Sequence, residues 1–538
     1  MTSSSNFDQK ITSQQKQIKQ LAEIGLALSA EKNISKLLEM IVDEARDLSN
    51  ADAGTLYIVD KDNMHLSFEI MQNDTMKTRM GGTNRNKITL PKVPLNIDGH
   101  PNHSNVSSYV ALTGKIVNIP DVYNAEGFDF TGPRKYDANT GYRSKSMLVI
   151  PMENHENEII GVLQLLNAKD FETGKLVPFS EKYVSLIASL ASQAAVALTN
   201  TQLIQNLENL FYSFIKSIAT AIDEKSPYTG GHIRRVVFLT MMLAGEINKT
   251  DCGKFKDIHL NDDQMEELRL AAWMHDVGKI TTPEYVVDKS TKLETIHDRI
   301  FLIETRFYLI VGLIKNSYLS QKIELLKNKK IPEDKVKRID QDLCDELEQL
   351  YDELDFIKSC NKTKEFMDDD KIKRVKNIAE KTYLLNDETQ HYLTEDEVKN
   401  LCIRKGNLTE EERKIIENHA QMTSKILKQI PFSKKLANVA KYASAHHEKL
   451  DGSGYPDGLT EKEIPFQSRI MAVADIFEAL TAKDRPYKKP MKLSQAVKIM
   501  GFMKKDRHID PDIYDLFINN RLFYDYAKKE MFSEQIDM

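Results

Sequence analysis

The chain has 538 residues, more than one hydrophobic core can organise, so two or three domains are expected. Its hydrophobic fraction of 41% and charged fraction of 29% are ordinary for a soluble globular protein. The formal net charge of −6 gives no general support for binding an anionic surface. We therefore expect neither a polymeric nucleic acid nor a membrane surface as a partner.

The sequence predicts a cytoplasmic protein. No uninterrupted apolar stretch approaches the roughly 20 residues that a bilayer span needs. The N-terminal segment MTSSSNFDQK has no apolar signal core. The cysteines show no CxxC spacing, so neither disulfides nor thiolate zinc sites are expected. The four cysteines are Cys252, Cys344, Cys360 and Cys402.

The N-terminal part of the chain has the pattern of an α/β domain. Residues 1–17 are a polar lead-in, and a helical pattern starts near Leu21. Apolar alternation then predicts two β-hairpins. Their strands are Gly54–Val59 with Met64–Ile70, and Ser146–Met152 with Ile159–Leu166. A helical run over Phe179–Asn200 completes a sensory-type domain at 18–200.

A connector helix is predicted at 201–224. Its apolar residues are four, three and four positions apart, which is the seam of a two-stranded coiled coil and favours a homodimer. A single amphipathic helix lying on its own domain fits the same spacing. The seam residues are Leu203, Leu207, Leu210 and Phe214.

The remainder, 225–538, has almost no strand pattern and is predicted to be all-α. Within it, about 300–406 is rich in Lys, Glu and Asp, as in Asp368-Asp369-Asp370. We interpret this segment as a solvated helical insertion and expect an antiparallel helix pair. The fold class is therefore multidomain: an α/β sensory domain and an all-α domain with a helical insertion.

Five helical segments in the C-terminal part place seven metal-capable side chains on their apolar stripes or directly beside them. They are His232, His275, Asp276, His419, His446, His447 and Asp475. Burying this many ionisable groups is costly, and a metal centre is a compact way to compensate it. A purely structural polar core is the alternative.

The segment His275-Asp276-Val277-Gly278-Lys279 indicates the chemistry of such a centre. A carboxylate can bridge two metals while imidazoles supply the terminal ligands. Two metals roughly 3.5–4 Å apart can clamp the attacking and leaving oxygens of a phosphodiester. Lys279, one turn later, is placed to neutralise charge on phosphate oxygens. Spacing alone would fit many dinuclear hydrolases.

Further motifs narrow the choice. Beside His275-Asp276 they are Tyr228-Thr229-Gly230-Gly231-His232, Leu408-Thr409-Glu410, His446-His447-Glu448, Asp451-Gly452-Ser453-Gly454-Tyr455-Pro456, Ala472-Val473-Ala474-Asp475, Ala479-Leu480-Thr481, Asp484-Arg485-Pro486-Tyr487-Lys488 and His508-Ile509-Asp510-Pro511. Together they resemble the HD-GYP family of HD phosphohydrolases. The resemblance covers about 225–300 and 407–520, and implies an all-α domain that hydrolyses cyclic di-GMP to the linear dinucleotide or to GMP.

The resemblance also implies roles for individual residues. One metal would be bound by His232, His275, Asp276 and Asp475. Asp276 would bridge to a second metal, held also by His419, His446 and His447. The metals would be iron or manganese, and Asp276 and Lys279 would be the catalytic pair. Phosphates would be held by Lys279, Arg485 and Lys488, and the Gly454-Tyr455-Pro456 loop would shape the pocket rim or dock a partner domain.

Two departures from the family pattern matter. Members with a third metal carry a Glu where this chain has Tyr228, so two metals are expected. An insertion separates Leu293 from Leu408, where the family has a short link. The insertion contains a second HD dipeptide, His297-Asp298, which no Gly-Lys follows. We interpret that dipeptide as part of a charged helical surface.

Residues from about 20 to 200 resemble a GAF sensory domain, which implies an unidentified small ligand or signal. Asn167, Lys169 and Phe179 match only part of the cyclic-nucleotide-binding signature, since Tyr183 and Val184 replace its acidic pair. The leading hypothesis is a cyclic di-GMP phosphodiesterase regulated by this domain. Hydrolysis of another cyclic dinucleotide, or a catalytically silent receptor, are the alternatives.

Overall fold

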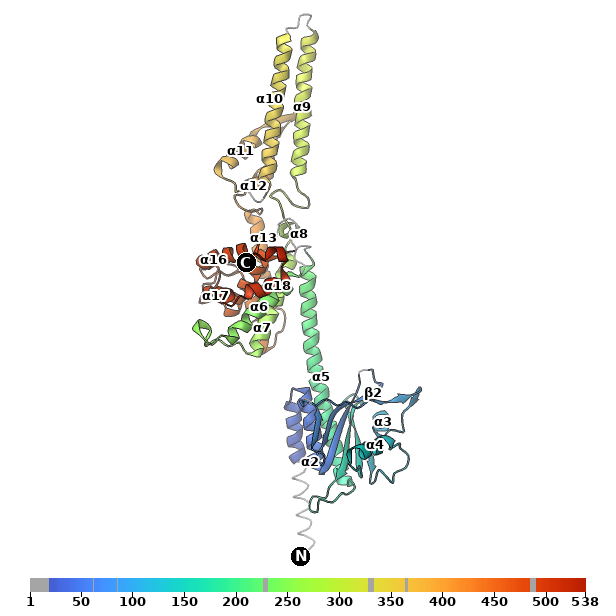
Figure 1. Cartoon of the computed structure of the whole chain (residues 1–538). Coiled ribbons are helices and arrows are strands. Elements are labelled where there is room, and N and C mark those ends of the chain that lie inside the picture. The colour runs from blue at the N-terminus through green and yellow to red at the C-terminus, as the bar shows by residue number, and fades with distance from the viewer. Residues whose placement is uncertain are drawn as a thin grey trace. The chain divides into compact units, whose positions relative to one another are not determined.

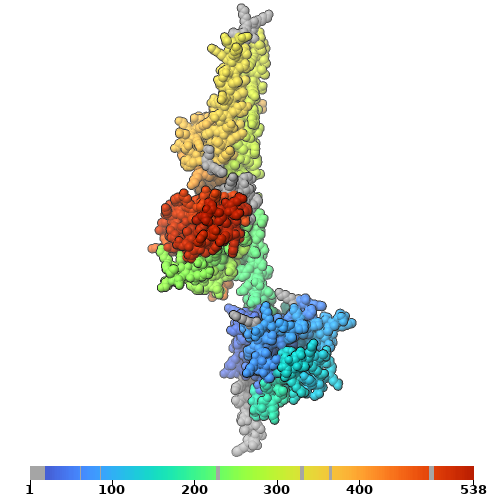
Figure 2. Space-filling model, in the orientation of Figure 1, coloured from blue at the N-terminus to red at the C-terminus, as the bar shows by residue number. Residues whose placement is uncertain are grey.

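The computed structural model describes residues 19–60, 62–84, 86–225, 231–327, 333–362, 366–483 and 490–538. The chain divides into two compact units, Met1–Phe211 and Tyr212–Met538. Figure 1 labels the elements of each unit, and Figure 2 shows their surfaces in the same colours.

The first unit contains an antiparallel sheet with strand order β3-β2-β1-β9-β8-β7, and β4 pairs with β2. Its elements are α2 (Ile34–Ser49), β1 (Ala51–Val59), β2 (His65–Asn73), β3 (Thr78–Gly81), β4 (Val93–Pro94), β5 (Asn96–Ile97), β6 (His100–Pro101), α3 (Val106–Thr113), β7 (Val117–Ile119), α4 (Thr131–Thr140), β8 (Met147–Glu153), β9 (Ile159–Ala168) and α5 (Glu181–Asp223). Both predicted hairpins, β1–β2 and β8–β9, are confirmed. The pairing of β1 with β9 joins them into one sheet.

The two faces of this sheet carry separate hydrophobic clusters. Strand side chains alternate between faces, so Leu56 packs in the cluster with α2 and α5 while its neighbour Tyr57 packs in the other. Likewise Leu163 belongs to the first cluster, and Gln164 lines a cavity on the opposite face. Helices α3 and α4 lie on that second side (Figure 1). The expected α/β sensory fold is confirmed.

Helix α5 is continuous from Glu181 to Asp223, so the boundary expected between 200 and 201 falls inside one helix. No Gly or Pro interrupts it, and its apolar positions continue. On length and composition alone, α5 could cross a membrane, which was not predicted from the sequence. Its first half packs in the core of the first unit through Ile187, Leu190 and Leu198. That half is therefore a core helix of the first unit.

The second unit is mostly helical, as expected. Its elements are α6 (His232–Lys249), η1 (Gly253–Phe255), α7 (Asp262–Met274), η2 (Val277–Thr281), α8 (Glu284–Val287), α9 (Ile300–Lys327), α10 (Glu333–Cys360), α11 (Asp369–Glu380), β10 (Thr382–Leu385), β11 (Glu388–His391), α12 (Glu395–Leu401), α13 (Glu410–Leu427), η3 (Lys434–Leu436), α14 (Val439–Ser444), α15 (Phe466–Thr481), α16 (Leu493–Lys505), α17 (Pro511–Asn519), α18 (Leu522–Glu530) and η4 (Ser533–Gln535). Here α6 packs against α7 and α15, and α13 packs against η2 and α14.

The insertion has a hydrophobic cluster of its own, formed by residues between Leu293 and Leu401. Helices α9 and α10 run side by side (Figure 1), and they are antiparallel because Lys358 pairs with Glu304 near one end. The hairpin β10–β11 was not predicted in this helical region. Its strands are only four residues long and largely exposed, so they carry little periodic signal.

The second HD dipeptide lies in a turn before α9, so its expected place in a helix was wrong. His297 is exposed, which agrees with a surface position. Asp298 is half-buried and accepts hydrogen bonds from Thr291 Oγ1 at 2.9 Å and Asn361 Nδ2 at 2.8 Å. Asp298 therefore fastens the entry of the insertion.

Candidate metal centre

Five segments of the second unit bring the seven metal-capable side chains together. His232 is the first residue of α6, and His275 directly follows α7. His419 and Asp475 lie within α13 and α15, while His446 and His447 come just after α14. All seven are buried except His447, which is half-buried.

Capping fixes where the helix that carries His419 begins. Thr409 Oγ1 accepts the backbone N–H of Glu412 at 3.2 Å, and a Glu412 carboxylate oxygen accepts that of Thr409 at 2.8 Å. This reciprocal pair is a capping box, which satisfies two otherwise unpaired donors. The same Glu412 carboxylate binds the buried Lys289 ammonium at 2.8 Å. The start of α13 is thus tied to the segment before the insertion.

One cluster of ligand atoms surrounds the Oδ2 atom of Asp276. Asp276 Oδ2 lies 3.5 Å from His232 Nε2 and 3.2 Å from His275 Nε2. Asp475 Oδ1 lies 3.3 Å from the same His232 nitrogen and 4.0 Å from that of His275. Two imidazoles and two carboxylates therefore face one small volume.

A second cluster surrounds the Oδ1 atom of Asp276. His419 Nε2 lies 3.4 Å from Asp276 Oδ1. The available ligand atoms of Asp276, His419, His446 and His447 all lie within 4.8 Å of one another. Asp276 thus belongs to two ligand groups, with one oxygen directed to each. The geometry suits a carboxylate that bridges two cations.

The hydrogen bonds of these histidines leave their Nε2 atoms directed into the site. The Nδ1 atoms of His275 and His446 contact the carbonyl oxygens of Ala272 and Ala443 at 2.8 and 2.6 Å. His419 Nδ1 contacts the Ile416 carbonyl in the same way. These contacts fix the tautomer with a free Nε2, as carbonyls do behind metal-bound histidines.

Four buried atoms of the site have no hydrogen-bond partner within the part of the chain that the structure describes. They are His275 Nε2, Asp276 Oδ1, His419 Nε2 and His446 Nε2. An unpaired buried polar atom costs about 1–3 kcal/mol, so four together require an explanation. Cations bound by these nitrogens and this oxygen would satisfy all four. The residues present therefore fit a metal pair.

The protonation states of the second cluster agree with this interpretation. Burial lowers the pKa of His446 to about 3, and it lowers the pKa of His419 and His447 as well. Burial alone would raise the pKa of Asp276, but the nearby Lys279 ammonium and His275 hold it well below its usual range. Neutral imidazoles and an ionised carboxylate are the forms that bind metals.

Lys279 is adjacent to the shared carboxylate. Its ammonium lies 2.5 Å from Asp276 Oδ2, and its side chain is 29% exposed. Lys279 lies in η2, directly after the HD dipeptide. A cation at the edge of the site can reach an anionic substrate as well as the carboxylate.

The Gly454-Tyr455-Pro456 loop packs against the second cluster. The Tyr455 ring lies 4.8 Å from that of His447 and 6.3 Å from that of His419. A Cβ at Gly454 would lie 2.4 Å from the Lys449 backbone nitrogen, so only glycine fits there. The contacts favour the rim position over a role confined to docking.

Sequence reasoning missed Glu478, which supports His232 from behind. The Glu478 carboxylate is fully buried, contacts His232 Nδ1 and accepts a hydrogen bond from Arg235 Nε at 2.7 Å. Burial opposes a proton on His232, but its carboxylate neighbours Glu478, Asp276 and Asp475 raise its pKa well above the usual value. Glu478 follows Asp475 by three residues, and that spacing on one helix face was the available signal.

Gly278 and Thr423, which were not singled out, hold α13 against the HD turn. The Gly278 N–H donates to Thr423 Oγ1, and that hydroxyl donates to the His275 carbonyl, both at 3.0 Å. A Cβ at Gly278 would lie 1.9 Å from the His419 carbonyl oxygen. The close approach of two backbones therefore places His419 beside Asp276.

The end of α5 also supports the site. The Lys225 ammonium donates to the carbonyls of Lys279, Ile280 and Thr282, at 3.2, 2.8 and 2.7 Å. Asp223 Oδ2 accepts the N–H of Gly231, the residue before His232, at 2.7 Å. Two of the turns that present metal-capable residues, the one before His232 and the one that contains Lys279, thus contact the end of α5 or the residues just after it.

Three residues of the sequence-based assignment lie outside the described part of the chain. They are Tyr228, Arg485 and Lys488. Their expected roles, an absent third-metal ligand and two phosphate contacts, stay predictions.

Comparison with known families identifies the two parts of the chain. Residues 33–198 match the family described as GAF domain. Residues 229–349 and 395–513 match families described as HD domain. The protein therefore contains a GAF domain followed by an HD-domain region. The HD-domain match over 395–513 includes Asp475.

Curated relatives match in the HD region. A probable cyclic di-GMP phosphodiesterase of Vibrio cholerae is 39% identical over 136 residues, covering 24% of this chain and 30% of the relative. A 3'3'-cGAMP-specific phosphodiesterase of the same organism is 42% identical over 112 residues, covering 20% and 23%. The chain thus spans less than a third of the length of these relatives. A solved GAF domain from an Acinetobacter phosphoenolpyruvate-protein phosphotransferase aligns at a TM-score of 0.26 and 17% identity, covering 36% of this chain and 98% of that one.

Proposed function

We propose that this GAF- and HD-domain protein is a metal-dependent phosphodiesterase that hydrolyses cyclic di-GMP to the linear dinucleotide, GMP or both. The observation that carries the proposal is Asp276, whose two oxygens face two separate groups of buried histidines. Such a pair of sites suits in-line displacement at a phosphodiester. Relatives named as cyclic dinucleotide phosphodiesterases match over 136 and 112 residues of the HD region.

The proposed sites divide the residues into two ligand sets. His232, His275, Asp276 and Asp475 would hold one divalent metal, and Asp276 with His419, His446 and His447 would hold the other. All the donors are imidazole nitrogens and carboxylate oxygens, a set that suits iron and manganese. When bound, the two metals supply a hydroxide nucleophile and stabilise the leaving oxygen.

The chain's own groups would bind and orient the substrate around these sites. The Lys279 ammonium, adjacent to Asp276 Oδ2, is placed to stabilise charge on a phosphate oxygen. Tyr455, stacked beside His447, would exclude water from that side of the pocket and set its width. Arg485 and Lys488 are proposed as further phosphate contacts on the motif resemblance alone.

A mixed cyclic dinucleotide is the second candidate substrate, favoured by the relative named as specific for 3'3'-cGAMP. Both substrates have the same phosphodiester backbone, so a shared metal centre serves either. They differ in one base. Parallel assays with the two dinucleotides distinguish these candidates.

We further propose that the GAF domain regulates hydrolysis through α5 in a cytoplasmic homodimer. The seam residues Leu203, Leu207, Leu210 and Phe214 are 47–66% exposed, so they do not lie on their own domain and are available to a second copy. At the other end of α5, Asp223 and Lys225 contact both metal-site turns. None of the four cysteines, all of which lie among the described residues, forms a disulfide, which suits a reducing compartment.

Turnover by the purified full-length chain tests the activity. Protein purified anaerobically with iron or manganese would be incubated with cyclic di-GMP and, separately, with 3'3'-cGAMP, and the products separated by chromatography. Wild type is expected to form the linear dinucleotide or GMP, and Asp276→Ala none. If metal-loaded wild type hydrolyses neither substrate, the proposed enzymatic activity is wrong, and a catalytically silent receptor becomes the favoured function.

A further inference from the structure

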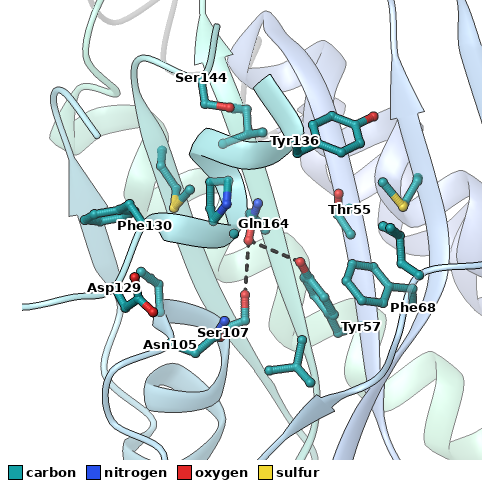
Figure 3. A pocket seen from close by; sticks show the side chains of 18 of the residues that line it. Thr55, Tyr57, Phe68, Asn105, Ser107, Asp129, Phe130, Tyr136, Ser144 and Gln164 are labelled. Carbon is teal, nitrogen blue, oxygen red and sulfur yellow. Dashed lines mark hydrogen bonds between the residues drawn. The ribbon is translucent and has the colours of Figure 1, made fainter. Parts of the chain in front are cut away.

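The GAF domain contains a cavity of about 300 Å³ on the sheet face covered by α3 and α4. Its wall is mainly apolar and aromatic, including Tyr57, Phe68, Phe130 and Met147. The Tyr57 and Phe68 rings lie 4.6 Å apart and form one side (Figure 3). This volume is at the small end of ligand pockets, which limits an occupant to a compact ring system.

Most polar groups that line the cavity already have partners in the protein. The Asn105 side-chain oxygen accepts the Ser108 N–H at 3.0 Å, and Ser144 donates twice to Asp137. The Gln164 amide oxygen, at the centre of Figure 3, accepts from Ser107 Oγ at 3.1 Å and Tyr57 OH at 3.4 Å. These groups position the wall and leave little hydrogen-bonding capacity for a ligand.

The amide nitrogen of Gln164, at the centre of Figure 3, keeps its hydrogen-bonding capacity. Because its oxygen receives both hydroxyls, the NH₂ group keeps two donors, and no hydrogen bond from it occurs among the described residues. Gln164 lies mid-strand in β9 and is only half-buried, since it borders the cavity. A ligand acceptor placed against this nitrogen would satisfy it.

The charge of the wall indicates the charge of the ligand. Among the described residues that line the cavity there is no Lys or Arg, and the single charged side chain is Asp129. Asp129 is exposed at the rim, and its carboxylate accepts the Thr131 N–H at the start of α4. An anion would meet repulsion and no counter-ion, and a buried charge of either sign would lack a partner.

We propose that this cavity binds a small, uncharged aromatic molecule whose carbonyl or ring-nitrogen acceptor pairs with the Gln164 amide NH₂. Aromatic rings of the ligand pack between Tyr57, Phe68 and Phe130, and the amide fixes their orientation. The class excludes cyclic nucleotides and other phosphates. Binding in this cavity is independent of the hydrolysis proposed for the second unit, so a failure of either proposal leaves the other untouched.

Calorimetric titration of the full-length protein with three bicyclic probes tests the ligand class. Isoquinolin-1-one is neutral and has a carbonyl acceptor. The second probe, 1-naphthoate, has two fused rings and a negative charge. The third, 1-naphthylamine, is neutral and has an amino donor in place of the carbonyl and no ring nitrogen. Isoquinolin-1-one is expected to bind wild type at least about tenfold more tightly than either of the others. Equal or tighter binding of 1-naphthoate, or no binding of isoquinolin-1-one up to about 1 mM, would overturn the proposal.

The variant Gln164→Glu locates the site. A carboxylate still accepts from Ser107 and Tyr57, so the wall is kept, but the NH₂ donors are lost. The affinity for isoquinolin-1-one should fall by about tenfold or more, and 1-naphthylamine should become the tighter ligand. An unchanged order of the two probes in this variant would show that Gln164 does not contact the ligand, and would reject the assignment.

Discussion

Substituting alanine for Gly278 should remove one of the two proposed metals and leave the other. A Cβ at this position would lie 1.9 Å from the His419 carbonyl oxygen and 2.6 Å from the Thr423 nitrogen. Close C···O contacts in proteins are about 3.3 Å, so α13 and the HD turn must separate by about 1.4 Å. Metal sites tolerate ligand displacements of about 0.2 Å. The ligand set that depends on α13 should therefore fail.

The other ligand set does not involve α13. His232, His275 and Asp475 belong to α6, the end of α7 and α15. Metal content should fall from about two ions per chain to about one, and turnover should drop by at least about 10², the scale of a 1 Å misplacement. Metal analysis and steady-state kinetics on the same preparation measure both.

Two companion variants keep the result interpretable. Gly245→Ala in α6 is the matched control, because its Cβ would have no neighbour within 4 Å. It should keep both metals and full activity. Thr423→Val removes the hydroxyl that links Gly278 to His275 without adding bulk, and should weaken the second metal if Gly278→Ala proves unstable. Full metal content and wild-type turnover in Gly278→Ala would refute the reasoning.

Three further predictions concern the supports of the site. Lys225→Met should lower turnover about tenfold with metal content unchanged, since three charge-assisted bonds to the HD turn are lost. Lys225→Arg should recover part of the turnover, whereas metal loss in step with activity would argue for a merely structural role. Replacing 291–405 with a short Gly/Ser linker should leave about two metals bound. The two flanks already meet where Asn407 contacts the Lys289 carbonyl, and the insertion has its own core. A metal-free or insoluble product would show the insertion to be part of the HD fold. Inserting one to four residues after Leu207 should make turnover vary with a period near 3.6 residues, whereas flat turnover across the series would exclude coupling through α5.

Local patterns predicted the hairpins of the GAF domain but not its complete sheet. Alternation located β1–β2 and β8–β9, since a half-buried strand has a period of two. The pairing of β1 with β9 joins segments more than 100 residues apart, as in Tyr57 opposite Val162. No local pattern contains that contact. The cavity beside Gln164 depends on the same long-range packing.

The site was predictable in its ligands more than in its supports. The histidines have a side chain suited to metals and continue the apolar spacing of helices, so type and spacing both pointed to them. In the structure His275, His446 and His447 lie just past the helix ends. Glu478 had only its spacing from Asp475 as a signal. Lys225 acts on backbone carbonyls, and Gly278 acts through the absence of a side chain. Such contacts depend on the tertiary arrangement and leave no pattern along the chain.

Metal stoichiometry of Asp276→Ala beside wild type tests the central claim most directly. Both ligand groups contain Asp276, so one substitution should disturb both, unlike Gly278→Ala. Elemental analysis of anaerobically purified protein is expected to give about two transition-metal ions per wild-type chain and well below one per variant chain. A wild-type protein with about one ion, or a folded Asp276→Ala variant that retains a full equivalent, would contradict the shared carboxylate.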